Sequence, residues 1–172
     1  MSTVRTTAFD DFVTATTPRL FRVAWAITGD YHLAEDALQA AYVSAYSRWR
    51  RISQADNPEA YVRRMVVNQV LGWRRRASFG ERPSARLPDL RVVESAEADV
   101  DRSDVVWRGI QALAPRQRAI VVLRYYEQLS EAEIAETLGI RPGTVKSQAS
   151  AALANLRLLL AAEGASFEGE PA

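Results

Sequence analysis

The sequence of 172 residues has no cysteine and a single histidine. The lack of cysteine excludes a disulfide framework, a zinc knuckle and cysteine nucleophilic catalysis, and one histidine cannot build a histidine-rich metal site. No apolar run approaches the roughly 18 residues that a membrane span requires, and the N-terminus has neither a basic nor an apolar signal region. We therefore expect a cytoplasmic protein without membrane insertion, metal or cofactor.

Strand-like alternation is also missing, because almost every periodic segment has helical spacing. The predicted fold class is all-α, with two small helical domains joined by a flexible linker. An interruption of the first helix at Thr17-Pro18 stays open, and Asp30 is the predicted entry to the second. The predicted helices span residues 8–28, 31–49, 58–78, 103–113, 115–127, 130–138 and 142–161.

The predicted linker, residues 79–103, mixes proline, glycine, serine and alternating charge without an apolar stripe. It divides the chain into a first domain at 1–78 and a second at 104–162. The acidic tail at 163–172 is predicted to be disordered.

A net charge of only +1 conceals a strong segregation, because residues 1–76 hold eleven arginines against seven acids. Between 48 and 76 the ratio sharpens to eight arginines against Asp56 and Glu59. The positive electrostatic field of such a segment favours binding of phosphates. The alternative is a solvated basic face without a partner. The eight residues are Arg48, Arg50, Arg51, Arg63, Arg64, Arg74, Arg75 and Arg76.

The helix predicted over 58–78 begins at a clear start signal, Asn57-Pro58-Glu59. Its two faces differ, since Arg64, Asn68 and Arg75 share one side and could face a nucleic acid. The opposite side is predicted to be buried and consists of Val62, Met65, Val66, Val70 and Trp73. For Trp73 a core position is favoured over base stacking, as it is for Trp25, Trp49 and Trp107.

The helix predicted over 31–49 carries a polar flank of Glu35, Asp36 and Gln39. These residues could pair with basic groups of a protein partner, or form a solvated face. Neither carboxylate has a nucleophile or base beside it, so no catalytic residue is predicted. The opposite stripe of small residues contains Leu33, Ala37, Ala40 or Ala41, and Ser44.

Residues 129–157, LSEAEIAETLGIRPGTVKSQASAALANLR, have the spacing of a helix-turn-helix. Ala135 permits a close helix crossing, Gly139 can end the first helix at positive φ, and Val145 returns to the core. Ser130 and Glu133 predict a capping box at the start. A helical hairpin without a ligand is the less favoured alternative. The predicted inward face is Ile134, Leu138, Ile140, Val145, Ala149, Leu153 and Leu156.

The order of the segments 18–49, 57–76 and 113–157 resembles an extracytoplasmic-function sigma factor of bacterial RNA polymerase, in the sigma-70 family. The match extends over about residues 9–160 and looks closest to the SigE-like branch of actinobacteria. The resemblance implies that the first domain is sigma region 2-like, for core binding and for recognition and melting of the −10 element. It implies that the second is sigma region 4-like and reads the −35 element.

The resemblance also assigns roles to single residues. Glu35, Asp36 and Gln39 are expected to dock on the β′ clamp helices of core polymerase, with Ala40 where relatives commonly have an acid. Residues 53–57 are expected to capture an unstacked base. The expected −10 contacts are Arg64, Asn68, Arg74, Arg75 and Arg76.

In the second domain the resemblance implies a contact with the β flap, and a recognition helix on which Ala151 replaces the arginine usual in relatives. Gln148 could still read adenine through its amide. An anti-sigma factor is a further candidate partner. The expected −35 residues are Arg141, Thr144, Lys146, Ser147, Gln148, Ala151 and Asn155.

The leading hypothesis is therefore a promoter-specificity subunit. A free-standing helix-turn-helix regulator is the alternative, but it gives no role to the polar flank at 35–39 or to the basic segment. An enzyme has almost no support, since no phosphate-binding loop or nucleophile motif is present and His32 reads as a helix-entry residue.

Overall fold

The computed structural model describes residues 2–77 and 97–162. These two ranges contain helices and no strand, which agrees with the predicted all-α class. The predicted tail and most of the predicted linker lie outside the described residues. The elements are α1 (Ser2–Thr28), α2 (Tyr31–Ser47), α3 (Trp49–Ile52), α4 (Pro58–Ala77), α5 (Glu97–Ala112), α6 (Pro115–Val121), the π-helical η1 (Val122–Tyr126), α7 (Glu131–Leu138) and α8 (Pro142–Ala162).

Helix α1 continues through Pro18 without the interruption that the sequence left open. The hydroxyls of Thr16 and Thr17 bond back to the carbonyls four residues earlier, and both also contact the Tyr42 hydroxyl, at 2.8 and 3.1 Å. Packing against α2 therefore holds the helix together where proline removes a backbone donor.

Helix α2 ends earlier than predicted, and the chain turns at Arg48 into the short α3. The turn brings Trp49 and Ile52 into the core, and the Trp49 ring meets Phe9 and Phe12 at centroid distances of 5.0 and 4.9 Å. The prediction of one helix over residues 31–49 was therefore wrong, because aromatic packing redirects the chain. At the other end, Asp30 caps α2 as predicted by accepting from the Leu33 amide.

Other boundaries also differ from the sequence prediction, since α1 begins at Ser2, six residues before its predicted start. Helix α5 begins at Glu97, six residues before the predicted start. The helix predicted over 115–127 instead changes at Val122 into η1, closed by a bond from the Glu127 amide to the Val122 carbonyl. A π-turn inserts an extra residue, so it rotates the side chains that follow it.

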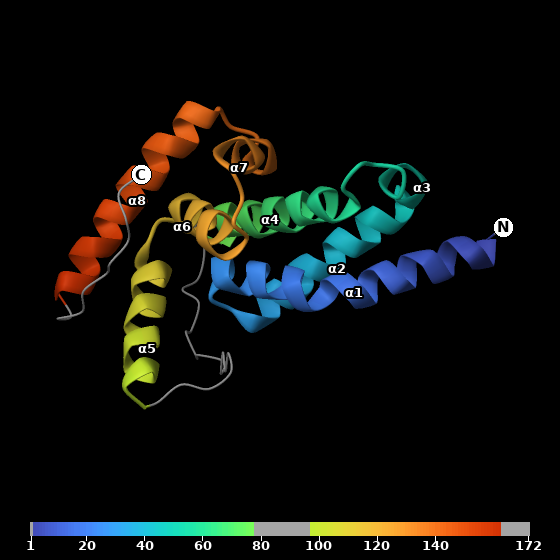
Figure 1. The fold of residues 1–172 in the computed structure, drawn as a ribbon. Helices are drawn as coiled ribbons and strands as arrows, with labels where there is room; N and C mark the ends of the chain where they lie inside the picture. The colour runs from blue at the N-terminus through green and yellow to red at the C-terminus, as the bar shows by residue number, and fades with distance from the viewer. Residues whose placement is uncertain (1, 78–96, 163–172) are drawn as a thin grey trace.

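The described halves pack against each other, as Figure 1 shows, with α4 lying between the α1–α2 pair and α7. One apolar cluster joins them and includes Leu20 and Val66 from the N-terminal half and Ile120 and Ile134 from the C-terminal half. The rings of Trp25 and Trp107 stack across the same boundary at 4.4 Å. No helix in the described ranges combines the length and the apolar character that a membrane span needs.

Candidate DNA and polymerase interfaces

Helix α4 has the two faces that its sequence predicts, as far as its side chains are described. Asn57 starts the helix by accepting the Ala60 amide at 2.9 Å. Arg64 and Asn68 are exposed on one side, while the other packs into the core. Of the residues predicted to be buried, Val62, Val66 and Val70 are buried and Met65 and Trp73 are half-buried, and Val67 is buried as well. Burial of one face thus fixes the direction of the polar row.

The helical range of α4 includes Arg74, Arg75 and Arg76, whose side chains lie outside the described part of the structure. Arg64 is 3.9 Å from the Glu136 carboxylate of α7, and both side chains are largely solvated. Such a long, exposed ion pair contributes little stability and leaves Arg64 available to another anion.

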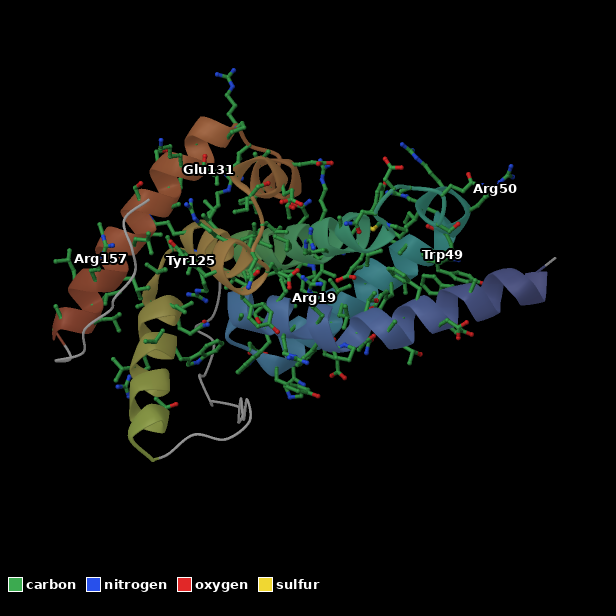
Figure 2. The ribbon with its side chains drawn as sticks, viewed as in Figure 1. Arg19, Trp49, Arg50, Tyr125, Glu131 and Arg157 are labelled. Carbon is green, nitrogen blue, oxygen red and sulfur yellow. The ribbon has the colours of Figure 1, made fainter. Side chains whose placement is uncertain are left out.

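The segment around α3 forms an exposed basic corner next to α4. Arg50 and Arg51 are exposed, and Figure 2 shows Arg50 at the opposite end of the molecule from Arg157 on α8. In the loop at 53–57 most residues are exposed, and the Ser53 hydroxyl donates to the Arg50 carbonyl. The Asn57 amide oxygen is already engaged as the cap of α4. Any base capture in this loop therefore falls to its other polar groups.

The polar flank of α2 is exposed as predicted, because Glu35, Asp36 and Gln39 all face solvent. Val43 continues the same flank one helical turn further and is 73% exposed. Val43 was not among the residues predicted for this flank, although its place four residues after Gln39 could have indicated it. On the buried side Ala37 and Ala41 pack inward, whereas Leu33, Ala40 and Ser44 are only half-buried. The burial of the stripe is therefore confirmed at Ala41 rather than Ala40.

The helix-turn-helix has the predicted local geometry. Ser130 and Glu133 form both bonds of a capping box, and Gly139 ends α7 with a φ of 64°. Ala135 and Val145 are buried between α7 and α8. Of the predicted inward face, only Ile140 and Leu153 are merely half-buried. These contacts leave one side of α8 facing outward.

That outward side of α8 contains the predicted recognition residues. Gln148 is half-buried, and Asn155 donates to Gln117 of α6 at 3.4 Å. The remaining five are exposed, namely Arg141, Thr144, Lys146, Ser147 and Ala151. The row thus consists of short polar groups and Ala151, with Arg141 just before the helix and Lys146 beside the row.

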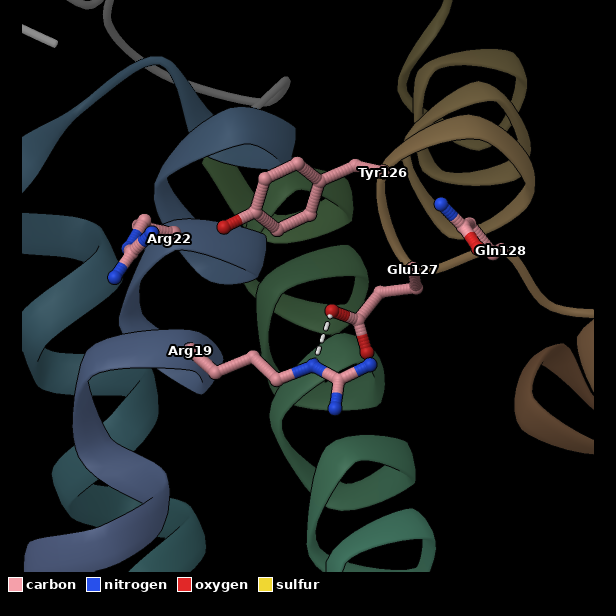
Figure 3. Close-up of a pocket in the computed structure, with 5 residues that line it drawn as sticks. All are labelled: Arg19, Arg22, Tyr126, Glu127 and Gln128. Atoms are coloured by element: carbon pink, nitrogen blue, oxygen red, sulfur yellow. Dashed lines mark hydrogen bonds and ion pairs between the residues drawn. The ribbon is translucent and has the colours of Figure 1, made fainter. Parts of the chain in front are cut away.

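A network of four alternating charges joins the two halves, and the sequence analysis did not find it. The Glu127 carboxylate accepts from Arg19 of α1 at 2.8 Å and from Arg63 of α4 at 3.2 Å, and Arg19 also reaches Glu59 at 3.4 Å. Figure 3 shows Arg19 pointing at Glu127 in a pocket of about 500 Å³ that Arg22, Tyr126 and Gln128 complete. The hydrogen bond to Glu127 and its charge raise the pKa of Arg19.

This network corrects the interpretation of one arginine. Arg63 belonged to the basic segment expected to suit phosphates, but its side chain is 7% exposed and faces Glu127, which is 1% exposed. A lone acid after VVLRYY has no periodicity that marks it as buried, so only the tertiary contact could identify it.

Comparisons with known proteins bear on both halves. The family model described as "Sigma-70 region 2" matches residues 12–79, and the family model described as "Sigma-70, region 4" matches residues 103–156. Together they match more than half of the chain. The chain belongs to the sigma-70 family. The region 2 match covers the half for which a free-standing regulator has no use, so the sigma factor hypothesis is favoured. Sigma factors are transcription initiation subunits that bind core RNA polymerase and promoter DNA, and they are not enzymes.

Individual relatives agree with this assignment. The RNA polymerase sigma-E factor of Streptomyces antibioticus is 39% identical over 149 residues, which cover 87% of this chain and 82% of the relative. That of Streptomyces avermitilis is 40% identical over 149 residues, covering 87% and 83%. The ECF RNA polymerase sigma factor SigM of Mycobacterium tuberculosis is 34% identical over 153 residues, covering 89% and 77%.

Two solved structures share the fold. Sigma factor RpoE from Bartonella quintana, in complex with the anti-sigma factor NepR, has a TM-score of 0.73 at 19% identity and covers 90% of this chain and 97% of its own. CnrH in complex with the cytosolic domain of CnrY has a TM-score of 0.61 at 20% identity, covering 92% and 90%.

Proposed function

We propose that this sigma factor divides its work between the two predicted domains, 1–78 and 104–162, and that separate exposed faces carry each contact. Helix α2 docks on core polymerase, α4 reads the −10 element and α8 reads the −35 element. An anti-sigma factor is a further proposed partner, and the cytoplasm, which holds core polymerase, is the proposed location.

The proposed polymerase-docking face consists of Glu35, Asp36, Gln39 and Val43. Its support is the exposure of three polar groups and one large apolar side chain on a single flank of α2. Within residues 2–77 and 97–162 these polar side chains form no intramolecular bond, so their polar atoms can pair with basic groups of a partner. The exposed valine supplies apolar area beside them, as interfaces with a polar rim require.

The proposed −10 surface is the row of Arg64 and Asn68 on α4, extended by Arg74, Arg75 and Arg76. These cations can hold backbone phosphates of an opened strand, while the adjacent loop at 53–57 receives a base whose unstacking costs a few kcal/mol. The short distance along the chain between loop and row supports their joint action on one strand.

The proposed −35 surface is the outward face of α8, with Arg141, Thr144, Lys146, Ser147, Gln148, Ala151 and Asn155. Two cations give it few phosphate contacts, so its affinity as a separate unit is expected to be low. Tethering through core polymerase raises the effective concentration of this surface at the promoter.

The docking proposal is tested by replacing Asp36 and Gln39 together with alanine in the full chain. Affinity for core polymerase should fall by about 2 to 4 kcal/mol if these are central contacts. The matched control replaces Asp10 and Asp11, two equally exposed acids on α1, and should bind core as the unaltered chain does. Unchanged core affinity of the α2 variant, with native helicity, would reject the assignment.

A further inference from the structure

One arginine beside the four-charge network has no carboxylate partner. The network itself balances two arginines against two acids. Arg22 follows Arg19 by three residues on α1 and is exposed, and its Nε atom donates to the Pro18 carbonyl at 3.2 Å. Within residues 2–77 and 97–162 no acid forms an ion pair with Arg22. Positive charge is therefore in excess around this side chain.

Arg22 borders two cavities. The first is the polar cavity of about 500 Å³ that Arg19 and Gln128 also line, drawn in Figure 3. The second has a volume of about 250 Å³ and is called here the aromatic cavity. Tyr126 lines both cavities, as Arg22 does, so the two adjoin each other. The aromatic cavity is lined by Arg22, Trp25, Ala26, Trp107, Ile110, Val121, Val122, Tyr125 and Tyr126.

The aromatic cavity combines a rigid wall with an open mouth. Trp25 and Trp107 stack with ring centroids 4.4 Å apart. Tyr125 and Tyr126 are 47% and 46% exposed, so the cavity can be reached from solvent. Among the described residues that line it, only Arg22 carries a charge. Such a lining gives water few hydrogen-bond partners, whereas a flat apolar ring can stack on it or meet the edges of its rings.

We propose that the two cavities form one binding site for an organic anion that carries a flat apolar ring. The ring lies in the aromatic cavity, and the acidic group, a carboxylate, sulfonate or phosphate, meets Arg22 where the cavities adjoin. A mostly apolar pocket with a single charged group to orient the ligand is typical of small-molecule sites. The site goes beyond the proposed contacts with polymerase and DNA, because none of their residues lines either cavity.

The charge preference is tested with two fluorescent probes, anilinonaphthalene sulfonate and phenylnaphthylamine, which share their rings but differ in the sulfonate. The full chain should bind the sulfonate saturably and more tightly than the uncharged probe. Arg22→Gln should weaken the sulfonate by about fivefold, as expected for an exposed charge pair, and leave the uncharged probe unaffected. The matched control is Arg116→Gln on α6, because Arg116 is exposed and lines neither cavity.

The aromatic cavity is tested by filling it. Ala26 lines this cavity and is half-buried, so Ala26→Leu places a larger side chain where the ring of the probe should lie. Both probes should then bind at least tenfold more weakly, with or without the sulfonate. The matched control is Ala15→Leu, an exposed position on the same helix, which should keep both affinities.

A second measurement locates the probe without any change in the lining, and it decides the question if Ala26→Leu loses helicity. The indole N–H signals of the tryptophans are followed by NMR and assigned through single Trp→Phe variants. Anilinonaphthalene sulfonate should shift the signals of Trp25 and Trp107. The signal of Trp49 should stay in place, because Trp49 packs against Phe9 and Phe12, far from Tyr125 in Figure 2.

Several results would overturn the site. They are the absence of saturable binding of the sulfonate probe, a shift at Trp49 without one at Trp25 or Trp107, and unchanged affinities in Ala26→Leu with native circular dichroism. Equal affinity of the sulfonate probe for Arg22→Gln and the unaltered chain would overturn the assignment of an anion. The probe measurements use the free chain, so they do not depend on whether it binds core polymerase.

Discussion

Helix α4 presents Arg64 and Asn68 on a face whose reverse side is closed by valines, and a run of three arginines follows at its end. The recognition face of α8 instead consists mainly of short polar side chains and Ala151, with Arg141 and Lys146 near its start. Helix α4 is suited to binding phosphates through charge, and α8 is suited to fitting closely against a DNA groove. In the proposed function, affinity for phosphates is thus concentrated in the N-terminal half, and the C-terminal half depends on tethering through core polymerase to reach the promoter.

The cores behind the two helices also differ. The N-terminal half packs aromatic rings around Trp49, with Phe9 and Phe12 at about 5 Å. The C-terminal half packs aliphatic side chains such as Leu156 and Leu160, with buried alanines, Ala135, Ala149 and Ala152, where α7 and α6 cross α8. Small residues allow close helix crossings but leave little redundancy, so a single cavity there should be costly.

The largest expected effect is on the stability of the C-terminal half. Leu156 is 1% exposed, and Leu156→Ala should lower the free energy of unfolding by about 2–5 kcal/mol. Leu158 lies on the same helix at 71% exposure, and Leu158→Ala should change stability by less than about 0.5 kcal/mol. Urea unfolding followed by circular dichroism compares the two, and equal losses would contradict the described packing of α8.

The next largest effect is expected on DNA opening and tests the role of positive charge on α4. Replacing Arg74, Arg75 and Arg76 together with alanine should impair open-complex formation and lower the salt slope of binding to single-stranded −10 DNA by about two units. Asn68→Ala should reduce opening without changing that slope. Core binding should stay unaltered in both. Permanganate footprints that show normal melting would count against the −10 assignment.

A smaller effect is expected from making α8 resemble α4. Ala151→Arg should tighten binding to a duplex with the mapped −35 element by about 1–3 kcal/mol and steepen the salt dependence by about one charge. Gln148→Ala should instead relax base preference with little change of slope. Titrations at several salt concentrations separate the two. If Ala151→Arg alters neither affinity nor slope, this face does not meet DNA.

The smallest effect concerns the capping box of α7. The Ser130 hydroxyl, which donates to the Glu133 carboxylate at 2.7 Å, lowers the pKa of Glu133 from its ordinary value of 4.5. A carboxyl with a lowered pKa contributes stability above that ordinary value and loses it as the pH falls through the folded-state pKa. The melting temperature should therefore fall more steeply below pH 4.5 in the unaltered chain than in Glu133→Gln. If the melting temperatures of the two proteins change in parallel with pH, the stability of the cap does not depend on the charge of Glu133.

Local chemistry in the sequence was sufficient to predict much of the fold. Asp30, Asn57 and Ser130 cap their helices as predicted, and Gly139 ends α7 at positive φ, because each signal acts within a few residues. The exposed flank of α2 and the two faces of α4 follow from helical periodicity, which fixes direction once one face is buried.

Contacts between distant residues decided the rest. Only the tertiary structure turns the chain at Arg48, carries α1 through Pro18 and inserts the π-turn of η1. It also buries Arg63 against Glu127, 64 residues away, where the sequence shows only another arginine in a basic segment. The sequence determines which faces are polar, since that is a local pattern, whereas the partner of a buried charge depends on which elements pack together.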